Sequence, residues 1–244
     1  MPQLPLVLVP VCLLAAPAAA DSILDRLYVG TDVGVSIVPD IKTRQIAATA
    51  GTIGLSGLEI DMDAGVDWSI ELGLRLSDSL AVELQSGYVF NRVNRASGTY
   101  TSIAPDPVAG GSGHFGQVPI LANAIWEIPL TPGESGVGSL KLQLGAGVGA
   151  VNIQGSLTAG GGGAVTGIEM SADGSGWAFG YQGTVALLWS LSTNIDVGIR
   201  YRFMGTTGVD LGPISEASGA LAPGNLETDA VFTNAIQASL SIRF

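Results

Sequence analysis

The sequence is poor in charged residues and in cysteine, and each shortage excludes a class of protein. Only 13% of its 244 residues are charged, and 21 Asp and Glu stand against 10 Lys and Arg. Because so acidic a chain cannot neutralise a run of phosphates, we expect no nucleic-acid partner. The one cysteine, Cys12, lies in a predicted leader. The mature chain should therefore have no disulfide, no thiolate metal site and no cysteine nucleophile.

A long apolar run is also missing. Apolar residues make up 47% of the chain, yet no run reaches the roughly 18 residues that a membrane-spanning helix needs. The opening MPQLPLVLVPVCLLAAPAAADS has an apolar stretch too short to cross a bilayer, followed by alanines just before Asp21. This pattern predicts a cleaved secretory signal over residues 1–20, and residues 21–244 would form one mature domain.

What the sequence does contain is alternation of apolar and polar residues with a period of two, which indicates β-strands with two different faces. Eight stretches show it: 27–37, 64–76, 80–90, 116–128, 139–152, 177–189, 195–203 and the C-terminal end. Short connections (77–79, 129–138, 190–194) alternate with long ones (38–63, 91–115, 153–176, 204–230). The pattern predicts an all-β fold, a closed eight-stranded antiparallel up-and-down transmembrane barrel. The long connections are rich in small and polar residues, and we expect mobile loops without a core of their own.

The two faces of these strands predict the environment. One face is uniformly apolar, while the other holds the charged residues. A charge turned toward lipid at mid-depth costs about 2–4 kcal/mol, so we expect the charged face to line the lumen, where opposite charges on neighbouring strands can pair. The predicted lumen charge network is Asp32, Asp67, Glu71, Arg75, Glu83, Glu127, Lys141, Arg200, Arg202 and Arg243.

Aromatic residues fall toward both ends of the predicted strands, as expected of amphipathic rings at two membrane–water interfaces. The belt near the long loops would contain Tyr88, Phe90, Phe115, Trp177, Phe179, Tyr201, Phe203 and Phe232. The belt near the short turns would contain Trp126, Trp189 and Phe244. The last strand should close the sheet on the first, because lipid cannot satisfy an open edge.

Three stretches resemble a known family: VPILANAIWEIPL (118–130), GYQGTVALLWSLSTNIDVGIRYRFMGT (180–206) and the terminal ASLSIRF (238–244). They are similar to the small eight-stranded outer-membrane barrels of the opacity and outer-membrane-protein-A type, the "porin family". The resemblance implies a multi-pass barrel in the outer membrane of a Gram-negative bacterium. It also implies outer-membrane lipids, lipopolysaccharide and the outer-membrane assembly machinery as partners, with Leu240, Ile242 and Phe244 as the assembly signal.

The sequence leaves three functions open. The first is a structural or surface-interaction role through four long extracellular loops that meet an unknown surface ligand. The second is a small conducting pore, because glycines on the lumen face would leave space. The third is a lipid-modifying enzyme in which His114, the only histidine, acts as a base near Ser112. No partner spacing supports the third, so we expect no catalytic residue, no enzyme activity and no cofactor.

Two further motifs are weaker still. The stretch LEIDMDAGVD (58–67) gathers four acidic residues near the outer mouth, but Gly65 and Leu72 occupy positions where an EF-hand needs oxygen ligands. A solvated acidic rim is the expectation, with weak divalent-ion binding as the alternative and no dedicated metal site. GAGVGA (145–150) imitates a nucleotide-binding fingerprint, but no helix follows it. Its glycines are expected on the lumen face, where they allow close strand packing.

Overall fold

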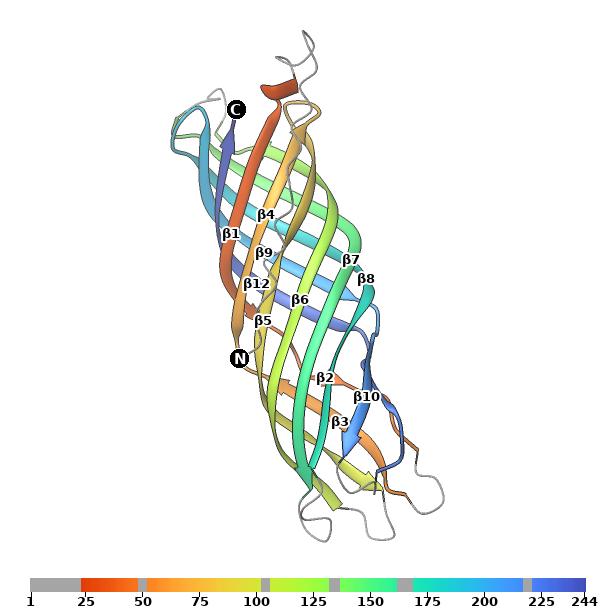
Figure 1. Ribbon diagram of the computed structural model, residues 1–244. Helices are drawn as coiled ribbons and strands as arrows, with labels where there is room; N and C mark the ends of the chain where they lie inside the picture. The colour runs from red at the N-terminus through yellow and green to blue at the C-terminus, as the bar shows by residue number, and fades with distance from the viewer. Residues whose placement is uncertain (1–22, 48–51, 102–105, 132–136, 162–168, 217–220) are drawn as a thin grey trace, which may run out of the picture.

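The computed structural model describes residues 23–47, 52–101, 106–131, 137–161, 169–216 and 221–244, and the predicted signal over 1–20 lies outside these ranges. Within them the chain folds into an elongated β-barrel (Figure 1). Its strands are β1 (Leu27–Ile37), β2 (Ile41–Lys42), β3 (Gly54–Met62), β4 (Gly65–Arg75), β5 (Leu80–Thr101), β6 (Asp106–Pro129), β7 (Leu140–Gly161), β8 (Glu169–Ser190), β9 (Ile195–Thr206), β10 (Asp210–Glu216), β11 (Asn225–Glu227) and β12 (Val231–Arg243). No helix among the described residues is long and apolar enough to cross a membrane.

Eight of these strands form the predicted ring, in the order β1, β4, β5, β6, β7, β8, β9, β12. Every neighbouring pair is antiparallel. The last strand pairs with the first from Tyr28↔Arg243 to Ile37↔Asn234, which closes the ring. The predicted closed antiparallel barrel is therefore confirmed, and we call this part of the molecule the proximal section.

Four strands continue far beyond the proximal section. β5 to β8 are 22 to 24 residues long, whereas β1, β4, β9 and β12 have 11 to 13. At the far ends β3 pairs with β5 and β10 pairs with β8, while β2 and β11 pair with β3 and β10. Figure 1 shows β2, β3 and β10 at the end opposite the C-terminus. We call this end the distal section.

The distal section closes into a ring of its own. Thr43 forms an isolated bridge with Thr228, which joins the end of β2 to the end of β11. On either side of it the Arg44 N–H donates to the Glu227 carbonyl at 2.9 Å and the Asp229 N–H donates to the Lys42 carbonyl at 2.9 Å. A second barrel built of β2, β3, β10, β11 and the far halves of β5 to β8 therefore stands on the first.

The long connections were predicted to be loops without a core, and that prediction is wrong. Within the described ranges they form the distal strands, and their apolar side chains make one buried cluster. The largest members in the distal section include Ile41, Leu58, Tyr100, Leu157 and Met170. The distal section therefore has an apolar interior, like a soluble barrel.

The pattern was missed because the apolar face changes sides along each long strand. On β7, Val148 is exposed on the outer face, whereas Val151, Ile153 and Leu157 are buried inside. Between the inward residues lie polar ones such as Gln154, which faces out. Alternation continues without a break, but its apolar phase shifts by one residue where the strand passes from the proximal to the distal section.

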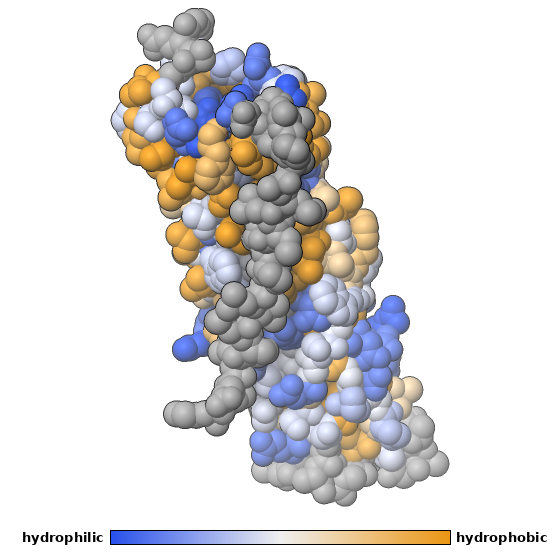
Figure 2. Space-filling model, turned by 45° about the horizontal axis from the view of Figure 1, so that its top comes forward, coloured by the Kyte–Doolittle hydropathy of each residue, from blue (hydrophilic) through white to orange (hydrophobic). Residues whose placement is uncertain are grey.

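The proximal section carries its apolar residues on the outside, as predicted. Val33, Trp68, Leu84 and Ile199 are each between 47% and 66% exposed. Figure 2 shows apolar residues gathered over the half of the molecule at the top of the view and polar residues over the other half. The eleven residues of β1, at about 3.3 Å each and a tilt of about 40°, rise about 28 Å, close to the roughly 25 Å apolar band of outer-membrane barrels.

Candidate functional site

The lumen of the proximal section contains the predicted charges, and Arg200 stands at the centre of them. Its guanidinium donates to Asp32 Oδ2 at 2.6 Å, to Glu71 Oε1 at 3.4 Å and to Gln143 Oε1 at 2.9 Å. Three strands other than its own are thus tied to β9 through one side chain. Buried charges are retained where partners and hydrogen bonds offset their desolvation.

Neutral side chains extend this cluster across the lumen. Ser69 donates to Glu71 at 2.7 Å, and Gln85 donates to the same carboxylate at 2.9 Å. Gln182 then donates to Gln85, and it also donates to Asn123 Oδ1 at 2.7 Å. Together with Arg200 and its partners, the hydrogen-bonded side chains come from every proximal strand except β12. We call this set the central network: Asp32, Ser69, Glu71, Gln85, Asn123, Gln143, Gln182 and Arg200.

Tyr28 and Glu83 form a pair beside the central network. The Tyr28 hydroxyl donates to Glu83 Oε1 at 2.6 Å, and both residues are buried. The Tyr28 ring also lies over Gly73, where a Cβ would stand 2.0 Å from the ring. A lumen glycine on this strand therefore leaves no empty space, because an aromatic side chain fills it.

A second group lies toward the short turns. Asp196 accepts from Lys141 at 3.1 Å, from Arg243 at 2.9 Å and from Ser190 at 2.5 Å. Arg75 and Glu127 approach to 3.9 Å in the same region. All the predicted lumen charges are therefore inside the barrel, and they fall into separate groups instead of one network.

The third group lies toward the distal section. Arg202 donates to Asp67, and their side chains are only 1% and 0% exposed. Nearby strands add neutral pairs, with Gln117 donating to Thr233 at 2.8 Å and Ser36 donating to Asn91 at 3.1 Å. Beyond them begins the apolar cluster, which includes the fully buried Val89, Leu121, Val151 and Met204.

Sequence reasoning missed several members of these groups. Tyr28, Asn123, Gln143, Gln182 and Asp196 were outside the predicted network, although each shares the lumen phase of the alternation with the charged residues. That phase was the available signal, since an uncharged polar residue on the lumen face must also find a partner when buried.

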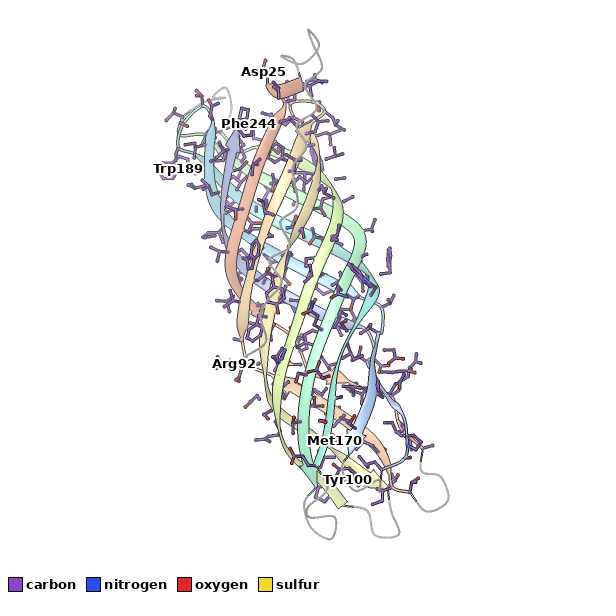
Figure 3. The ribbon with its side chains drawn as sticks, viewed as in Figure 1. Asp25, Arg92, Tyr100, Met170, Trp189 and Phe244 are labelled. Atoms are coloured by element: carbon purple, nitrogen blue, oxygen red, sulfur yellow. The ribbon has the colours of Figure 1, made fainter. Side chains whose placement is uncertain are left out.

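The residues predicted for the aromatic belts point outward, with one exception. Trp126, Trp177, Trp189 and Tyr201 are exposed and Phe203 is partly exposed. Figure 3 shows Trp189 and Phe244 at the same end of the barrel. Ring contacts join the residues near the distal section: Tyr88 with Phe90, Tyr181 with Phe203, and Phe203 with Phe232. Phe115 was assigned to this belt wrongly: it is buried in the apolar cluster, because its strand turns it inward.

The predicted assembly-signal residues lie on the outer face of β12 and at its end. Leu240, Ile242 and Phe244 are 38%, 41% and 62% exposed. The C-terminal residue is fixed by a backbone hydrogen bond, because the Phe244 N–H donates to the Leu27 carbonyl at 3.2 Å. An aromatic end is thus held on the first strand, and its role as a signal stays a prediction.

The acidic stretch 58–67 does not gather into one site. Glu59 pairs with Lys42 at 3.4 Å, Asp61 accepts from Asn94 at 3.4 Å, and Asp67 faces the lumen. Across the described ranges, no group of three or more His, Cys, Asp or Glu side chains could hold a metal ion.

Two other predicted positions have plain structural surroundings. His114 lies on the outer face of β6, with its ring 6.0 Å from that of Phe90. Gly147 faces the lumen, where a Cβ would stand 1.7 Å from Asn123 Oδ1, so its glycine allows close packing. In the distal section, the pKa of Asp210 is lowered because its carboxylate accepts from the Gly212 N–H and from Asn225.

Comparison with known proteins supports the fold. No protein-family model and no curated protein matches the sequence. Among solved structures, the outer membrane protease OmpT from Escherichia coli superimposes with a TM-score of 0.53 at 10% identity, over 89% of this chain and 97% of that chain. The chain has the fold of the outer-membrane β-barrels.

Two smaller likenesses are found among other outer-membrane barrels. Neisserial surface protein A gives a TM-score of 0.43 at 15% identity, covering 89% of this chain and 97% of that chain. The outer membrane protein OprG from Pseudomonas aeruginosa gives 0.46 at 11% identity, covering 89% of this chain and 96% of that chain. These likenesses concern the fold, and the location rests on the barrel's own exposed apolar belt.

The belt places this outer-membrane barrel in its bilayer. A closed barrel satisfies its backbone internally and exposes apolar side chains over the height of the hydrocarbon region. In barrels of this type the short turns are periplasmic and the long connections are extracellular. The proximal section is therefore the membrane-spanning part, and by this rule we expect the distal section outside the cell.

Proposed function

We propose that this outer-membrane barrel is a non-conducting, non-catalytic protein that holds a rigid extracellular platform for contact with molecules at the cell surface. The observation that carries the proposal is the second barrel ring beyond the apolar belt. A ring with its own apolar interior needs no ligand to keep its shape. It can therefore present a fixed outer surface at a height that short turns could not reach.

The outer surface of the distal section supports a role in contact with water-exposed molecules. Its outward residues on β7 and β8 are polar and uncharged for the most part, among them Gln154, Thr158, Ser171 and Ser175. Gln154 donates to Asn152 at 3.0 Å along the strand. Amides and hydroxyls on the outer wall of this ring offer hydrogen bonds without strong charge, and a fixed surface loses little conformational entropy when a partner binds.

The lumen argues against conduction. The central network crosses the barrel in the membrane, and the apolar cluster that includes Val89 and Met204 fills it above. The lumen glycines leave less room than their number suggests, because Glu71 packs against Gly30 and Asn123 against Gly147. Eight strands leave an interior that side chains can fill.

The surroundings of His114 argue against catalysis on lipid. The imidazole stacks on Phe90, and its register partners are Arg92 on β5 and Ser156 on β7. Among the described residues, no hydrogen bond joins His114 to Ser156 or to Ser112, so neither hydroxyl is aligned with a base as acyl transfer requires. The proposal therefore assigns no catalytic residue to this barrel, and an unchanged lipid A profile in cells that carry His114→Ala would agree with it.

The decisive experiment removes the platform and keeps the membrane barrel. Residues 39–63, 94–112, 155–174 and 208–229 are each replaced by a short Asn-Gly turn, and folding is checked by gel migration before and after heating. We expect cells with this trimmed barrel to lose adherence to surfaces while their resistance to detergents stays that of the full-length strain. Unchanged adherence, or a lost detergent barrier, would contradict the platform role.

Planar-bilayer recording tests the closed lumen separately. We expect the refolded full-length barrel to give no stable openings. Replacement of Arg200 and Arg202 by alanine should not reveal a defined pore either, because the apolar cluster remains above them. Stable unitary conductance in the full-length protein, lost on replacement of these arginines, would favour the pore instead.

A further inference from the structure

Most basic residues of this acidic chain are paired, and two of the three exceptions lie close together on one strand. Seven of the ten Lys and Arg lie within 4.0 Å of a carboxylate. Among the described residues, the three without such a carboxylate are Arg26, near the short turns, and Arg92 and Arg95 on β5. Two unpaired guanidinium groups on one strand are unexpected where acidic residues outnumber basic ones two to one.

Both of these arginines point away from the barrel. Arg92 and Arg95 are exposed, and Figure 3 shows Arg92 projecting outward between the two ends of the molecule. A register shift between β3 and β5 separates Asp61↔Arg95 from Met62↔Val93. This irregularity turns Arg95, three residues beyond Arg92, to the outer face as well. We call the pair the β5 arginine patch.

The position of Arg92 along the strand is that of a lipid headgroup, and Arg95 lies three residues farther from the aromatic belt. Phe90 and Tyr88 contact each other in the aromatic belt, and Arg92 follows Phe90 by two residues on the same face. Two residues span about 7 Å along a strand, or about 5 Å along the membrane normal at a tilt of about 40°. The interfacial layer on each side of the hydrocarbon is about 5–7 Å thick. Arg92 therefore lies in that layer.

We propose that the β5 arginine patch binds the phosphorylated headgroup of a lipid in the outer leaflet. Guanidinium groups bind phosphate through paired N–H donors, and a cation at a membrane surface is attracted to an anionic headgroup. The adjoining rings of Phe90 and His114, stacked at 6.0 Å, give an apolar wall beside which an acyl chain can lie. This lipid-binding proposal goes beyond the platform role and is independent of it.

The nearest acidic residues leave the patch available. Asp61 is the register partner of Arg95, but its carboxylate accepts from Asn94 at 3.4 Å. Asp63 is joined to β5 through its backbone, where its N–H donates to the Arg92 carbonyl at 2.9 Å. In the part of the chain that the structure describes, neither carboxylate comes within ion-pair distance of Arg92 or Arg95.

The test compares two double variants that lose the same charge. Arg92→Gln with Arg95→Gln removes the patch, whereas Lys42→Gln with Arg44→Gln removes two exposed cations that are already paired with Glu59 and Glu227. All four side chains are exposed on the outside of the barrel, so both variants should fold, which gel migration checks. Each protein is refolded in zwitterionic detergent and titrated with bisphosphorylated lipid A or with its fully dephosphorylated form, and bound lipid is counted by native mass spectrometry.

We expect the unsubstituted barrel to bind the phosphorylated lipid more tightly than the dephosphorylated one. Loss of both patch arginines should weaken that binding about 25-fold, which corresponds to about 2 kcal/mol, and the Lys42/Arg44 control should change it less than twofold. No preference for the phosphorylated form, or equal weakening in both double variants, would overturn the proposal. The proposal would also be overturned if the Arg92/Arg95 double variant kept its lipid binding but lost binding of a soluble sulfated polysaccharide, because the patch would then bind a different polyanion.

Discussion

The buried pair of Arg202 and Asp67 offers a quantitative test of the lumen's energetics. Their side chains are 1% and 0% exposed, and each is the other's charged partner. Removal of one partner leaves a bare charge in a site without water contact, which costs about 3–5 kcal/mol. We therefore expect Arg202→Leu and Asp67→Leu each to destabilise the barrel by that amount. With an m-value of about 2 kcal/mol per molar urea, the midpoint should fall by about 2 M.

Removal of both partners should restore most of the loss. Apolar residues that replace a buried ion pair are often neutral or stabilising, so we expect the double Leu variant to lie within about 1 kcal/mol of the original protein. The coupling energy from the cycle would then be at least about 5 kcal/mol. Urea unfolding of the barrel refolded in lipid vesicles, followed by tryptophan fluorescence, measures all four proteins.

A matched cycle on Lys42 and Glu59 supplies the control. This pair joins β2 to β3 at 3.4 Å with side chains 67% and 47% exposed. An exposed pair should couple by no more than about 1 kcal/mol. If the Arg202–Asp67 coupling were as small as that of this pair, burial would not be the source of its energy and the reasoning would fail.

Four further predictions follow from other parts of the barrel. Gly34→Ala places a Cβ 2.0 Å from the Ile236 carbonyl oxygen, whereas the Cβ of Gly183→Ala has nothing within 4 Å. In urea unfolding, the first variant should lose about 1–3 kcal/mol of stability and the second little. Equal losses would contradict the geometry. Ile199, 66% exposed on the apolar belt, should cost about 2–4 kcal/mol when replaced by Lys, against less than about 0.5 kcal/mol for Ser175→Lys; similar values would argue against a lipid-facing belt. Leu58 is 1% exposed in the distal section, so Leu58→Asp should let proteases cut that section on intact cells while the membrane barrel stays folded, and full protection would refute a separate distal core. Asn225→Ala should raise the pKa of Asp210 toward its ordinary value of about 3.9, because one of two donors to the carboxylate is lost while the Gly212 N–H remains. The stability that this lowered pKa contributes is present above the pKa of Asp210 in the unfolded chain and is lost as the pH falls through its pKa in the folded chain. An unchanged pKa of Asp210 in an NMR titration of the variant would disprove the contribution of Asn225.

The proximal section could be predicted from sequence because its two faces differ strongly. Large residues such as Trp68 and Leu84 alternate with residues such as Asp67 and Gln85, and the cost of a charge in lipid decides which face is outside. The distal section could not be predicted in the same way. Along β7 the apolar residues change from the outward face, where Val148 lies, to the inward face. Small or polar residues there also lower the difference in hydrophobicity between the two faces.

The lumen residues were predictable one at a time, but their partners were not. Arg200 and Asp32 are 168 residues apart, and they meet only because β12 closes the ring between their strands. Alternation fixes the face of each residue, whereas the contact across a closed barrel depends on stagger between strands that are not sequence neighbours. The Phe115 assignment failed for a related reason, since its strand leaves the aromatic belt with that ring pointing inward.

A spin-label scan along β7 in lipid vesicles tests most directly whether each long strand passes from a lipid-facing barrel into a water-exposed one. Single cysteines replace residues 144–159 one by one, and collisions with oxygen and with a water-soluble nickel complex are recorded. We predict accessible labels at every even position throughout, with oxygen dominant up to Ala150 and the nickel complex dominant from Gln154 onward, and low accessibility at odd positions such as Ile153 and Leu157. Two results beyond residue 152 would contradict a single strand that passes from a lipid-facing barrel into a water-exposed one. The first is equal accessibility at odd and even positions, as in a loop, and the second is accessible labels at the odd positions.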